Sequence, residues 1–395
     1  MTKQIYFEPA GRILSSHEYV FLYPPVGYEF VVPQNKWDAI SGKGVATISD
    51  GPISSIIRPL LPWHFIKGQA ERYVKKPPGG ACLTFAWNHV VFRKEPWVIQ
   101  VEWPEMLTGW NHTSFRLLKG RIEKALASPY CRRIITWSEV SKNSFFPNLD
   151  CTDFMHKLEV VPLAVPKKQF TKTHDSSRVR VLFVGSAHVK GNLEYNFDFK
   201  GGKETLESFF ILNEKYDNLE FVVRAEIPWQ YKEKCKSFDN IRVIDELISA
   251  EQLEQEYLAA DIFVFPGHHT PFGVILEAMS YELPVVTTDV HGNRELVEDG
   301  VTGFVIDGSK NVPYFLGDSA LTSMTARHQF QQGIRSLDTK VVQDLVEKTS
   351  VLIENQELAR EMGRAGRWVV EEGDHSIGKR NEKLKKICDE ATGER

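Results

Sequence analysis

The second half of the chain alternates short apolar runs with helical stretches, and this alternation limits the possible folds more than any other feature. The runs are rich in β-branched residues and almost continuously hydrophobic, as expected of strands that are buried on both faces. They lie at Val179–Val184, Leu219–Val223, Ile241–Ile244, Ile262–Phe265, Pro284–Thr287 and Gly303–Ile306. Helical patterns lie between them at Lys203–Tyr216 and at Ala250–Ala259, the latter preceded by a capping box of Ser249 and Gln252. The alternation predicts a doubly wound parallel sheet.

The first half carries a weaker version of the same pattern. Strand-like runs lie at Val45–Ile48, Ala81–Trp87, Trp97–Val101 and Arg133–Trp137, whereas the first forty residues have no clean period. The polar, proline-bearing segment Pro162–Arg178 is typical of a linker between domains. We therefore predict an α/β domain over residues 1–164, a Rossmann-like domain over 165–374 and a terminal helix within 375–395.

The segment after Asp307 breaks the alternation. Because the pattern is lost over residues 308–338, we predict a long surface insertion there. Helical patterns resume at about Lys340–Asn355, Glu357–Glu372 and Ser376–Ala391.

Composition excludes several classes of protein. A formal net charge of -4 gives no reason to expect a nucleic-acid partner. The 5 cysteines form no C-x-x-C pair, which argues against a zinc site or a disulfide framework and for a reducing compartment. No apolar run approaches the roughly 20 residues of a membrane span, and the N-terminus lacks the apolar core of a signal peptide. We therefore expect a cytoplasmic protein.

The sharpest candidate site lies in residues 268–307. A buried strand ends near Pro266, and a helix is expected to begin near Gly273, where the small residue lets a ligand approach the backbone. The first amides of a helix lack internal partners and lie at the positive end of its dipole, so they suit a diphosphate. Glu277 follows in an apolar run and can accept hydrogen bonds from vicinal hydroxyls. The alternative is that Glu277 only complements the helix dipole.

A second candidate segment is 181–209. A strand ends at Gly185 and a loop is expected to follow, after which Lys200 stands beside two glycines just before a helix. Ligands bind beyond the carboxyl ends of parallel strands, where a lysine can neutralise phosphate. The alternative is a solvated lysine in a loop.

Together, in this order and at this separation, the two segments resemble glycosyltransferase family 4, the retaining GT-B enzymes that use nucleotide-sugar donors. The matching residues are Phe183–Gly185, Lys200–Gly202, Ala260–Pro266, Phe272 with Gly273, Glu277–Met279, Leu283–Val286 and His291–Asp307. Upstream, Ile135–Phe145 resembles the end of that family's N-terminal domain. The resemblance implies two Rossmann-like domains facing a cleft, with the C-terminal helix crossing back to the N-terminal domain.

The resemblance also implies roles for individual residues. Lys200 would hold the donor diphosphate and act in catalysis, and Glu277 would bind the donor ribose. The amides of Gly273 and Val274 would cradle the diphosphate, and backbone near Ile244 and Leu247 would flank the base. The donor would be a UDP- or GDP-sugar, with no metal ion and no further cofactor.

The chain departs from the family pattern at several positions. The first Glu of the family's Glu-x7-Glu motif is replaced by His269 or Thr270, depending on the alignment. Ser186 stands where the family often has Arg, and Arg224 at the end of the next strand offers a substitute charge or is merely a surface residue. Glu102 aligns with the family's N-terminal His, and we predict it as a second catalytic residue, with a solvated strand-end acid as the alternative.

The predicted donor contacts are drawn from strand ends and from the start of the helix near Gly273. They are Gly185, Ser186, Lys200, Arg224, Ile244, Leu247, His269, Thr270, Pro271, Phe272, Gly273, Val274 and Glu277. The resemblance implies transfer of a hexose-type sugar, with retention, to a sugar, lipid-linked or small-molecule acceptor in glycan, glycolipid or polysaccharide synthesis. The altered motifs leave two alternatives, an inactive nucleotide-sugar-binding protein and a GT-B phosphorylase or epimerase.

Residues 115–133 form a basic amphipathic pattern. Phe115, Leu118, Ile122 and Leu126 fall on one helical face, and basic residues outnumber the single acid Glu123. One interpretation is peripheral docking on anionic lipid. The other, which we favour, is a surface helix whose apolar face packs on its own domain.

Overall fold

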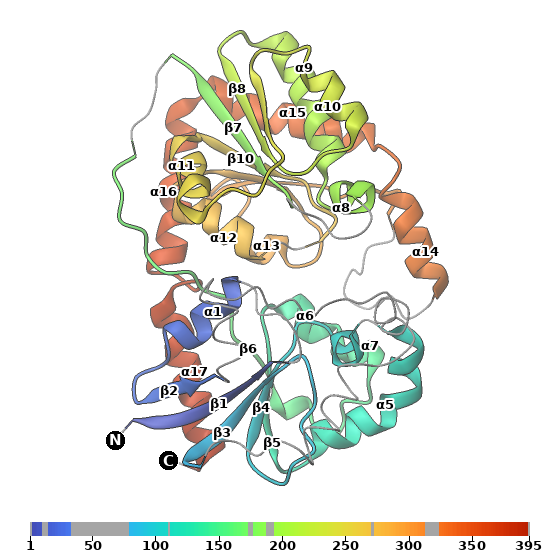
Figure 1. Cartoon of the computed structure of the whole chain (residues 1–395), viewed down its shortest axis with the longest axis vertical. Helices are drawn as coiled ribbons and strands as arrows, with labels where there is room; N and C mark the ends of the chain where they lie inside the picture. The colour runs from blue at the N-terminus through green and yellow to red at the C-terminus, as the bar shows by residue number, and fades with distance from the viewer. Residues whose placement is uncertain are drawn as a thin grey trace. The chain divides into compact units, whose positions relative to one another are not determined.

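The computed structural model describes residues 2–9, 15–32, 79–109, 111–172, 177–186, 193–269, 272–312 and 324–393. The chain divides into two compact units (Figure 1). The N-terminal unit contains Met1–Ala164 and Ile377–Arg395, and the C-terminal unit contains Val165–Leu316 and Thr325–Ser376. Each unit is built around its own parallel sheet, with six strands within the described residues.

The sheet of the N-terminal unit is formed from strands that pair in parallel throughout. In spatial order they are β2 (Tyr28–Val31), β1 (Lys3–Pro9), β3 (Ala81–Trp87), β4 (Trp97–Gln100), β5 (Cys131–Thr136) and β6 (Leu158–Val160). The predicted strands at 81–87, 97–101 and 133–137 are confirmed, whereas the predicted strand Val45–Ile48 lies outside the described residues.

Short helices and one long helix accompany this sheet. They are α1 (Ser15–Leu22), η2 (Pro104–Thr108), α5 (His112–Ala127), α6 (Glu139–Asn143), α7 (Phe145–Asn148) and η3 (Met155–Lys157). Helix α5 begins at the N-cap Asn111, whose side chain accepts a hydrogen bond from the amide of Ser114 at 2.9 Å.

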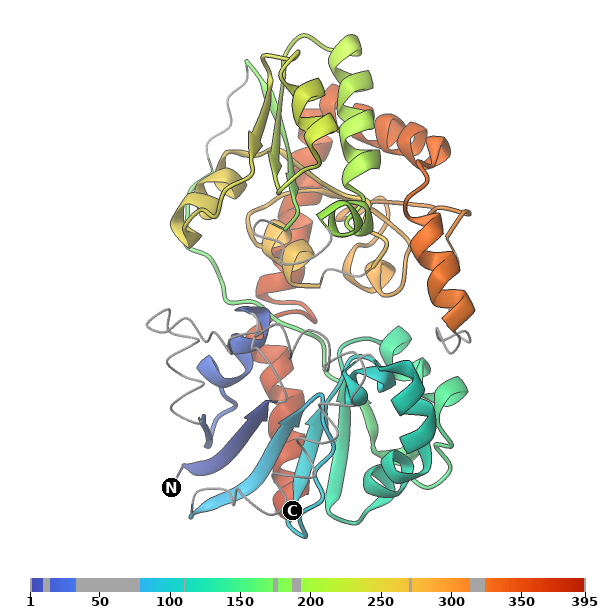
Figure 2. The ribbon, with the colours of Figure 1, turned by 45° about the vertical axis from the view of Figure 1, so that its right-hand side comes forward.

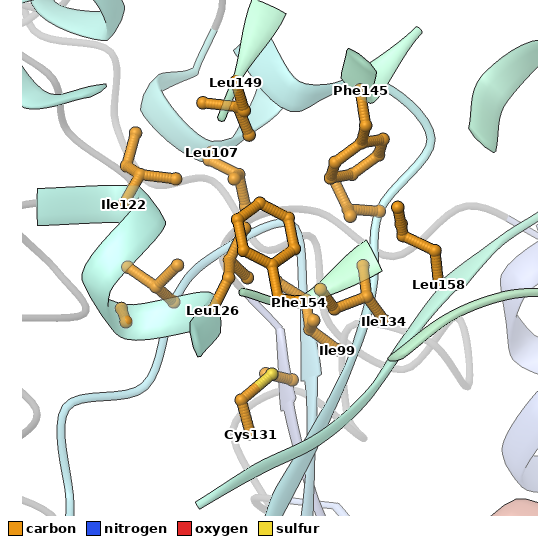
Figure 3. Close-up of a cluster of buried hydrophobic side chains, with 14 of the residues drawn as sticks. Ile99, Leu107, Ile122, Leu126, Cys131, Ile134, Phe145, Leu149, Phe154 and Leu158 are labelled. Atoms are coloured by element: carbon orange, nitrogen blue, oxygen red, sulfur yellow. The ribbon is translucent and has the colours of Figure 1, made fainter. Parts of the chain in front are cut away.

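The apolar face of α5 belongs to the core of the N-terminal unit. Figure 3 shows Ile122 and Leu126 pointing into the same cluster as Ile99 and Ile134 of the sheet, and all four side chains are buried. The interpretation in which this face packs on its own domain is therefore confirmed. The face that lipid docking would use is already covered by the protein.

Helix α17 (Ile377–Thr392) completes the N-terminal unit from the far end of the chain, and it contacts β3 and β5 (Figure 2). The Tyr28 hydroxyl donates to Asp389 Oδ1 at 2.7 Å, and the buried guanidinium of Arg380 donates to the carbonyl of Tyr23 at 2.7 Å. The predicted return of the last helix to the N-terminal domain is confirmed.

The sheet of the C-terminal unit is also parallel throughout. Its order is β12 (Gly303–Ile306), β11 (Val285–Thr288), β10 (Ile262–Phe265), β7 (Val179–Val184), β8 (Leu219–Arg224) and β9 (Ile241–Ile244). All six strands expected from the apolar runs are present, to within one residue at each end. The winding reverses between β7 and β10, as in a doubly wound fold.

Helices of the C-terminal unit connect these strands and follow the last of them. They are α8 (Leu193–Phe199), α9 (Gly202–Lys215), α10 (Trp229–Cys235), α11 (Ala250–Ala259), α12 (Phe272–Ser280), α13 (Asn293–Leu296), α14 (Met324–Gly333), α15 (Thr339–Glu354) and α16 (Gln356–Glu371). The capping box at α11 is present, with Ser249 and Gln252 bonded reciprocally.

Two expectations for the C-terminal unit were wrong. The stretch between Gly185 and Lys200 was expected to be a loop but contains α8, and the expected insertion 308–338 contains α14. The two helices contact each other through aromatic side chains. Phe330 of α14 packs edge-on against Phe199 of α8, with ring centroids 6.0 Å apart.

The two ends of the C-terminal unit lie side by side. Val165 and Ser376 form an isolated parallel bridge, so the chain enters and leaves this unit at neighbouring points. Within the described residues, no helix is both long and apolar enough to cross a membrane.

Candidate functional site

The carboxyl ends of β7 and β10 bring the two candidate segments together. These strands are neighbours, and the sheet order reverses between them. Such a switch point is where doubly wound folds bind ligands. Gly185 follows β7, and α12 follows β10 after a short connection.

A tight turn between α8 and α9 positions Lys200. Gly201 has a φ of 73°, and a Cβ at this position would collide with the carbonyl oxygen of Pro266. Glycine therefore allows the turn to lie directly against the end of β10. The amide of His268 also donates to the carbonyl of Phe199 at 3.0 Å, and the Lys200 Nζ lies 5.9 Å from the centroid of the Phe265 ring.

Lys200 and Arg224 are two cations whose charges lie close enough to affect one another. Burial, and then the nearby charge of Arg224, lower the pKa of Lys200 to about 8. Burial also lowers the pKa of Arg224, whose Nη1 donates only weakly to the Gly185 carbonyl at 3.4 Å. In the described part of the chain, no carboxylate pairs with either cation, and the buried Nε of Arg224 has no hydrogen-bond partner. An anionic ligand would offset both the free-energy cost of desolvating these charges and the repulsion between them.

Gly185, Ser186 and Lys200 line one shallow pocket at the end of β7. Its remaining walls come from the strand ends and from α8, and they are formed by Phe183, Asn196, Phe197, Ala225 and Glu226. The polar residues Asn196 and Glu226 were not predicted. Asn196 lies within the candidate segment 181–209 but outside the residues that match a motif, and Glu226 lies outside that segment.

The helix predicted near Gly273 begins one residue earlier, at Phe272. The amides of Gly273 and Val274 therefore lie in its first turn, where they have no partner inside the helix. Phe272 itself is buried. Thr270 and Pro271 lie outside the described residues.

Glu277 lies in the second turn of α12. Burial raises the pKa of its carboxyl group, the ammonium of Lys168 opposes this shift, and Glu254 adds to it. Lys168 Nζ lies 4.0 Å from Glu277 Oε1, and the Glu277 side chain is 36% exposed. The carboxylate is thus accessible to a ligand and partly neutralised.

His269, one of the two residues that can align with the first acid of the family pattern, carries an aromatic ring in its place. Its imidazole stacks on Phe199 with centroids 4.3 Å apart and meets Phe265 edge-on at 5.9 Å. Burial, and then the charge of Lys200, hold its pKa well below the ordinary value. His269 therefore carries no charge at neutral pH, and its contribution to a site differs from that of a carboxylate.

Two of the remaining predicted residues lie at the edge strand of the C-terminal sheet, and one belongs to the other unit. Ile244 ends β9 at the edge of the sheet, and Leu247 follows it with a side chain that is 67% exposed. Glu102 belongs to the N-terminal unit, where it follows β4, and burial raises its pKa to about 7. The catalytic role of Glu102 stays a prediction.

Sequence comparison supports the assignment of this region. The family model described as Glycosyl transferases group 1 matches residues 178–315. A D-inositol 3-phosphate glycosyltransferase of Geodermatophilus obscurus is 36% identical over 83 residues, which cover 21% of this chain and 18% of that protein. The capsular polysaccharide biosynthesis glycosyltransferase CapM of Staphylococcus aureus is 29% identical over 112 residues, 27% of this chain and 30% of that protein. The matches thus span less than a third of either relative.

Structural comparison extends over the whole chain. Anabaena HepE in complex with UDP-glucose has a TM-score of 0.60 at 13% identity, covering 99% of this chain and 100% of that chain. Sucrose-phosphate synthase from Thermosynechococcus elongatus has a TM-score of 0.64 at 13% identity, covering 100% of both chains. These likenesses confirm the predicted GT-B fold. Residues 178–315 thus match the model of the glycosyl transferases group 1 family, within a chain of GT-B fold.

Proposed function

We propose that this protein is a retaining glycosyltransferase that moves a hexose-type sugar from a nucleoside-diphosphate sugar to an acceptor hydroxyl. The observation that carries the proposal is the pair of half-buried cations Lys200 and Arg224 at the carboxyl ends of neighbouring strands, which no carboxylate of the described residues neutralises. A diphosphate supplies the negative charge that this pair lacks. The names of the relatives and the UDP-glucose bound to HepE support a sugar nucleotide as the ligand.

Lys200 would act chiefly on the leaving group. In retention without a protein nucleophile, the bond between the anomeric carbon and the phosphate oxygen breaks while the acceptor oxygen attacks on the same face. The acceptor's proton then passes to the departing phosphate oxygen. Charge develops on that phosphate in the transition state, and a positioned ammonium and helix amides stabilise it. The amides of Gly273 and Val274 would share this role.

The other predicted contacts would orient the donor. Glu277 would accept hydrogen bonds from the vicinal hydroxyls of the ribose, and backbone near Ile244 and Leu247 would flank a uridine or guanosine base. Arg224 would supply the positive charge that Ser186 does not. His269 would face the transferred sugar as a neutral group, which distinguishes this site from one with an acid there.

Charge compensation would make a metal ion unnecessary. Two cations and the amides of α12 can balance a diphosphate in place of Mg²⁺. Among the described residues, no group of three or more His, Cys, Asp or Glu side chains is arranged to hold a metal. Metal independence is tested directly by activity in the presence of a chelator.

We infer that the acceptor is a sugar or a lipid-linked sugar in polysaccharide or glycolipid synthesis, and that Glu102 handles it. The name of CapM supports a polysaccharide pathway. Glu102 suits this role because a carboxyl group with a pKa of about 7 exchanges a proton near neutrality.

A binding protein without transfer activity is the second candidate, and the neutral His269 is the observation that favours it. Slow hydrolysis of the donor, or transfer of its sugar to an acceptor, separates an enzyme from a binder. Phosphate dependence would instead indicate a phosphorylase.

A melting-temperature panel of nucleoside diphosphates and nucleotide sugars tests the proposal. A ligand that binds only the native state stabilises it by mass action, by about 2.7 kcal/mol at a hundredfold excess over the dissociation constant. We expect a UDP- or GDP-sugar to raise the melting temperature above all other compounds. No shift with any sugar nucleotide at millimolar concentration would contradict the proposed function.

Replacing Lys200 by Met sharpens the test, because it removes a half-buried charge that no carboxylate of the described residues neutralises. We expect kcat to fall at least about a hundredfold, while the unliganded protein melts at a higher temperature than the wild type. Lys236→Met, at an exposed site directly after α10, serves as the control and should change neither quantity. A Lys200→Met variant with normal turnover would remove Lys200 from catalysis.

The pH dependence of binding follows from the same residue. Because its pKa in the unliganded protein is about 8, Lys200 loses its charge as the pH rises through that value. Diphosphate binding favours the charged form, so affinity should fall above pH 8 and binding at pH 8.5 should take up a proton. Calorimetry in buffers of different ionisation enthalpy measures this uptake, and Lys200→Met should abolish it.

A further inference from the structure

The connecting segment, residues 165–172 at the start of the C-terminal unit, packs beside α12. Arg367 of α16 donates to the carbonyl of Lys168 at 3.0 Å, and its guanidinium lies 4.4 Å from the centroid of the Phe170 ring. Lys172 donates to the carbonyl of Tyr281 at 3.0 Å. The backbone around Lys168 is therefore held on both sides.

The side chain of Lys168 reaches from this segment to Glu277. Its Nζ lies 4.0 Å from Glu277 Oε1 and 5.1 Å from the centroid of the Tyr281 ring. The Lys168 side chain is only 22% exposed, so water screens this pair less than it screens a surface ion pair. The electron-rich face of Tyr281 adds a second attraction for the ammonium.

The charges around Glu277 differ in sign and in the element that carries them. Lys168 on the connecting segment favours the ionised carboxylate, whereas Glu254 on α11 and burial favour the protonated form. Tyr257 on α11 is also nearby, and its buried hydroxyl has no hydrogen-bond partner within the described residues. Among the groups that shift the pKa of Glu277, Lys168 is the cation.

The protonation state of Glu277 decides what it can bind. An ionised carboxylate accepts hydrogen bonds from two vicinal hydroxyls, whereas a protonated carboxyl group has one oxygen occupied by its own proton. Hydrogen bonds to the charged form are also the stronger ones. Without Lys168, burial and Glu254 would both act against the form that binds a pentose.

We propose that Lys168 is a positioning residue of the nucleotide site, which keeps Glu277 ionised and oriented to accept hydrogen bonds from the two ribose hydroxyls of the donor. The proposal rests on the proposed function, because it assumes that Glu277 binds a ribose. It makes the connecting segment a contributor to donor recognition.

The test compares UDP and GDP with their 2′-deoxy analogues, by calorimetry from pH 5 to pH 8, on wild type, Lys168→Met and Lys168→Arg. Removing Lys168 should weaken ribonucleotide binding about tenfold at pH 7 and leave the deoxy analogue nearly unaffected. The pH below which ribonucleotide binding is lost should move upward in Lys168→Met. Lys168→Arg should restore both properties, since it keeps the charge.

Lys167→Met provides the matched control, because Lys167 is the adjacent lysine and pairs with Glu372 at an exposed site. It should behave as the wild type does. Unchanged ribose discrimination and an unchanged pH midpoint in Lys168→Met would overturn the role of Lys168 while the proposed function stands. Failure of the wild type to bind either UDP or GDP would instead overturn the proposed function itself.

Discussion

Glu204 carries a carboxyl group that is completely buried on α9, one turn beyond Lys200. Neither of its oxygens meets a side-chain donor in the described part of the chain, and the amides of Glu204 and Asp338 oppose the effect of burial only in part. The neighbouring Lys203 is engaged elsewhere, because its Nζ donates to the carbonyl of Ile334 at 2.6 Å and lies 3.5 Å from Asp198. Burial raises the pKa of Glu204 to about 7.

Replacing Glu204 by Gln should therefore stabilise the protein only where Glu204 is charged. A carboxyl group whose pKa is higher in the folded state lowers the free energy of unfolding as the pH rises from its unfolded pKa, near 4.5, to its folded one, near 7. We expect equal stabilities at pH 4.5 and a gain of about 1–3 kcal/mol at pH 8, measured by urea unfolding. Glu214→Gln, at an exposed site on the same helix, should show no such pH dependence; a gain that is constant with pH would contradict the assignment.

Site residues could be predicted only where they lie in a recognisable sequence segment. Lys200 and Glu277 were predicted because each lies in a recognisable segment next to a strand end. Lys168 and Glu226 were not, because their importance arises only when distant parts of the chain pack together. The orientation of Arg224 toward Gly185 likewise follows from the pairing of β7 with β8.

At the scale of elements, the turn between α8 and α9 shows how packing places a site residue. A Cβ at Gly201 would strike the backbone of Pro266, and one at Gly202 would strike the ring of Phe197. The two glycines thus let α9 begin directly below the end of β10. The close approach of Gly201 to Pro266 thus places Lys200 beside the carboxyl end of β10.

Gly201→Ala should disturb both stability and binding, because alanine meets a positive φ and a backbone collision together. We expect a loss of about 2–4 kcal/mol in the free energy of unfolding and weaker binding of nucleoside diphosphate. Gly300→Ala is the control, since Gly300 has a similar φ of 76° but open space at the Cβ position. It should cost about 1 kcal/mol. Equal losses in the two variants would show that the collision with Pro266 is relieved at no cost.

The elements themselves were predicted unevenly, for a physical reason. The strands of the C-terminal unit are buried on both faces, so their sequences are continuously apolar and easily found. Strands β1 and β2 were missed because the first forty residues, rich in aromatics, have no clean period. Helix α14 was missed because it is mostly polar and is anchored to its unit by Phe330, whose partner Phe199 lies far away in the sequence.

At the scale of the whole molecule, the last helix is part of the N-terminal core rather than a tail. The side chains of Leu384, Ile387, Cys388 and Ala391 are buried. A chain that ends at Ser376 would leave the apolar side of β3 and β5 uncovered.

Truncation after Ser376 should therefore unfold the N-terminal unit while the C-terminal unit keeps its structure. We expect the loss of one of two calorimetric unfolding transitions and retention of nucleoside-diphosphate binding. Removal of only Gly393–Arg395 is the control and should preserve both transitions. Two intact transitions in the longer truncation would show that α17 is dispensable for the N-terminal core.

The two-domain plan was predicted from the strand-like runs in both halves and from the linker between them, although the first half of the sequence gives only part of its sheet. The resemblance added the return of the last helix to the N-terminal domain. The alternation of strands and helices predicted one doubly wound unit. The motifs that carry the resemblance lie mainly in that unit, and the family model matches the same region.

The bridge between Val165 and Ser376 makes the C-terminal unit a closed insert within the N-terminal one. An insert whose ends already touch adds little loop-closure entropy to its host, whatever its length. Such a module can be exchanged between relatives through two junctions placed at adjacent backbone positions. Evolution of a new donor preference would thus require no rebuilding of the half that surrounds the insert.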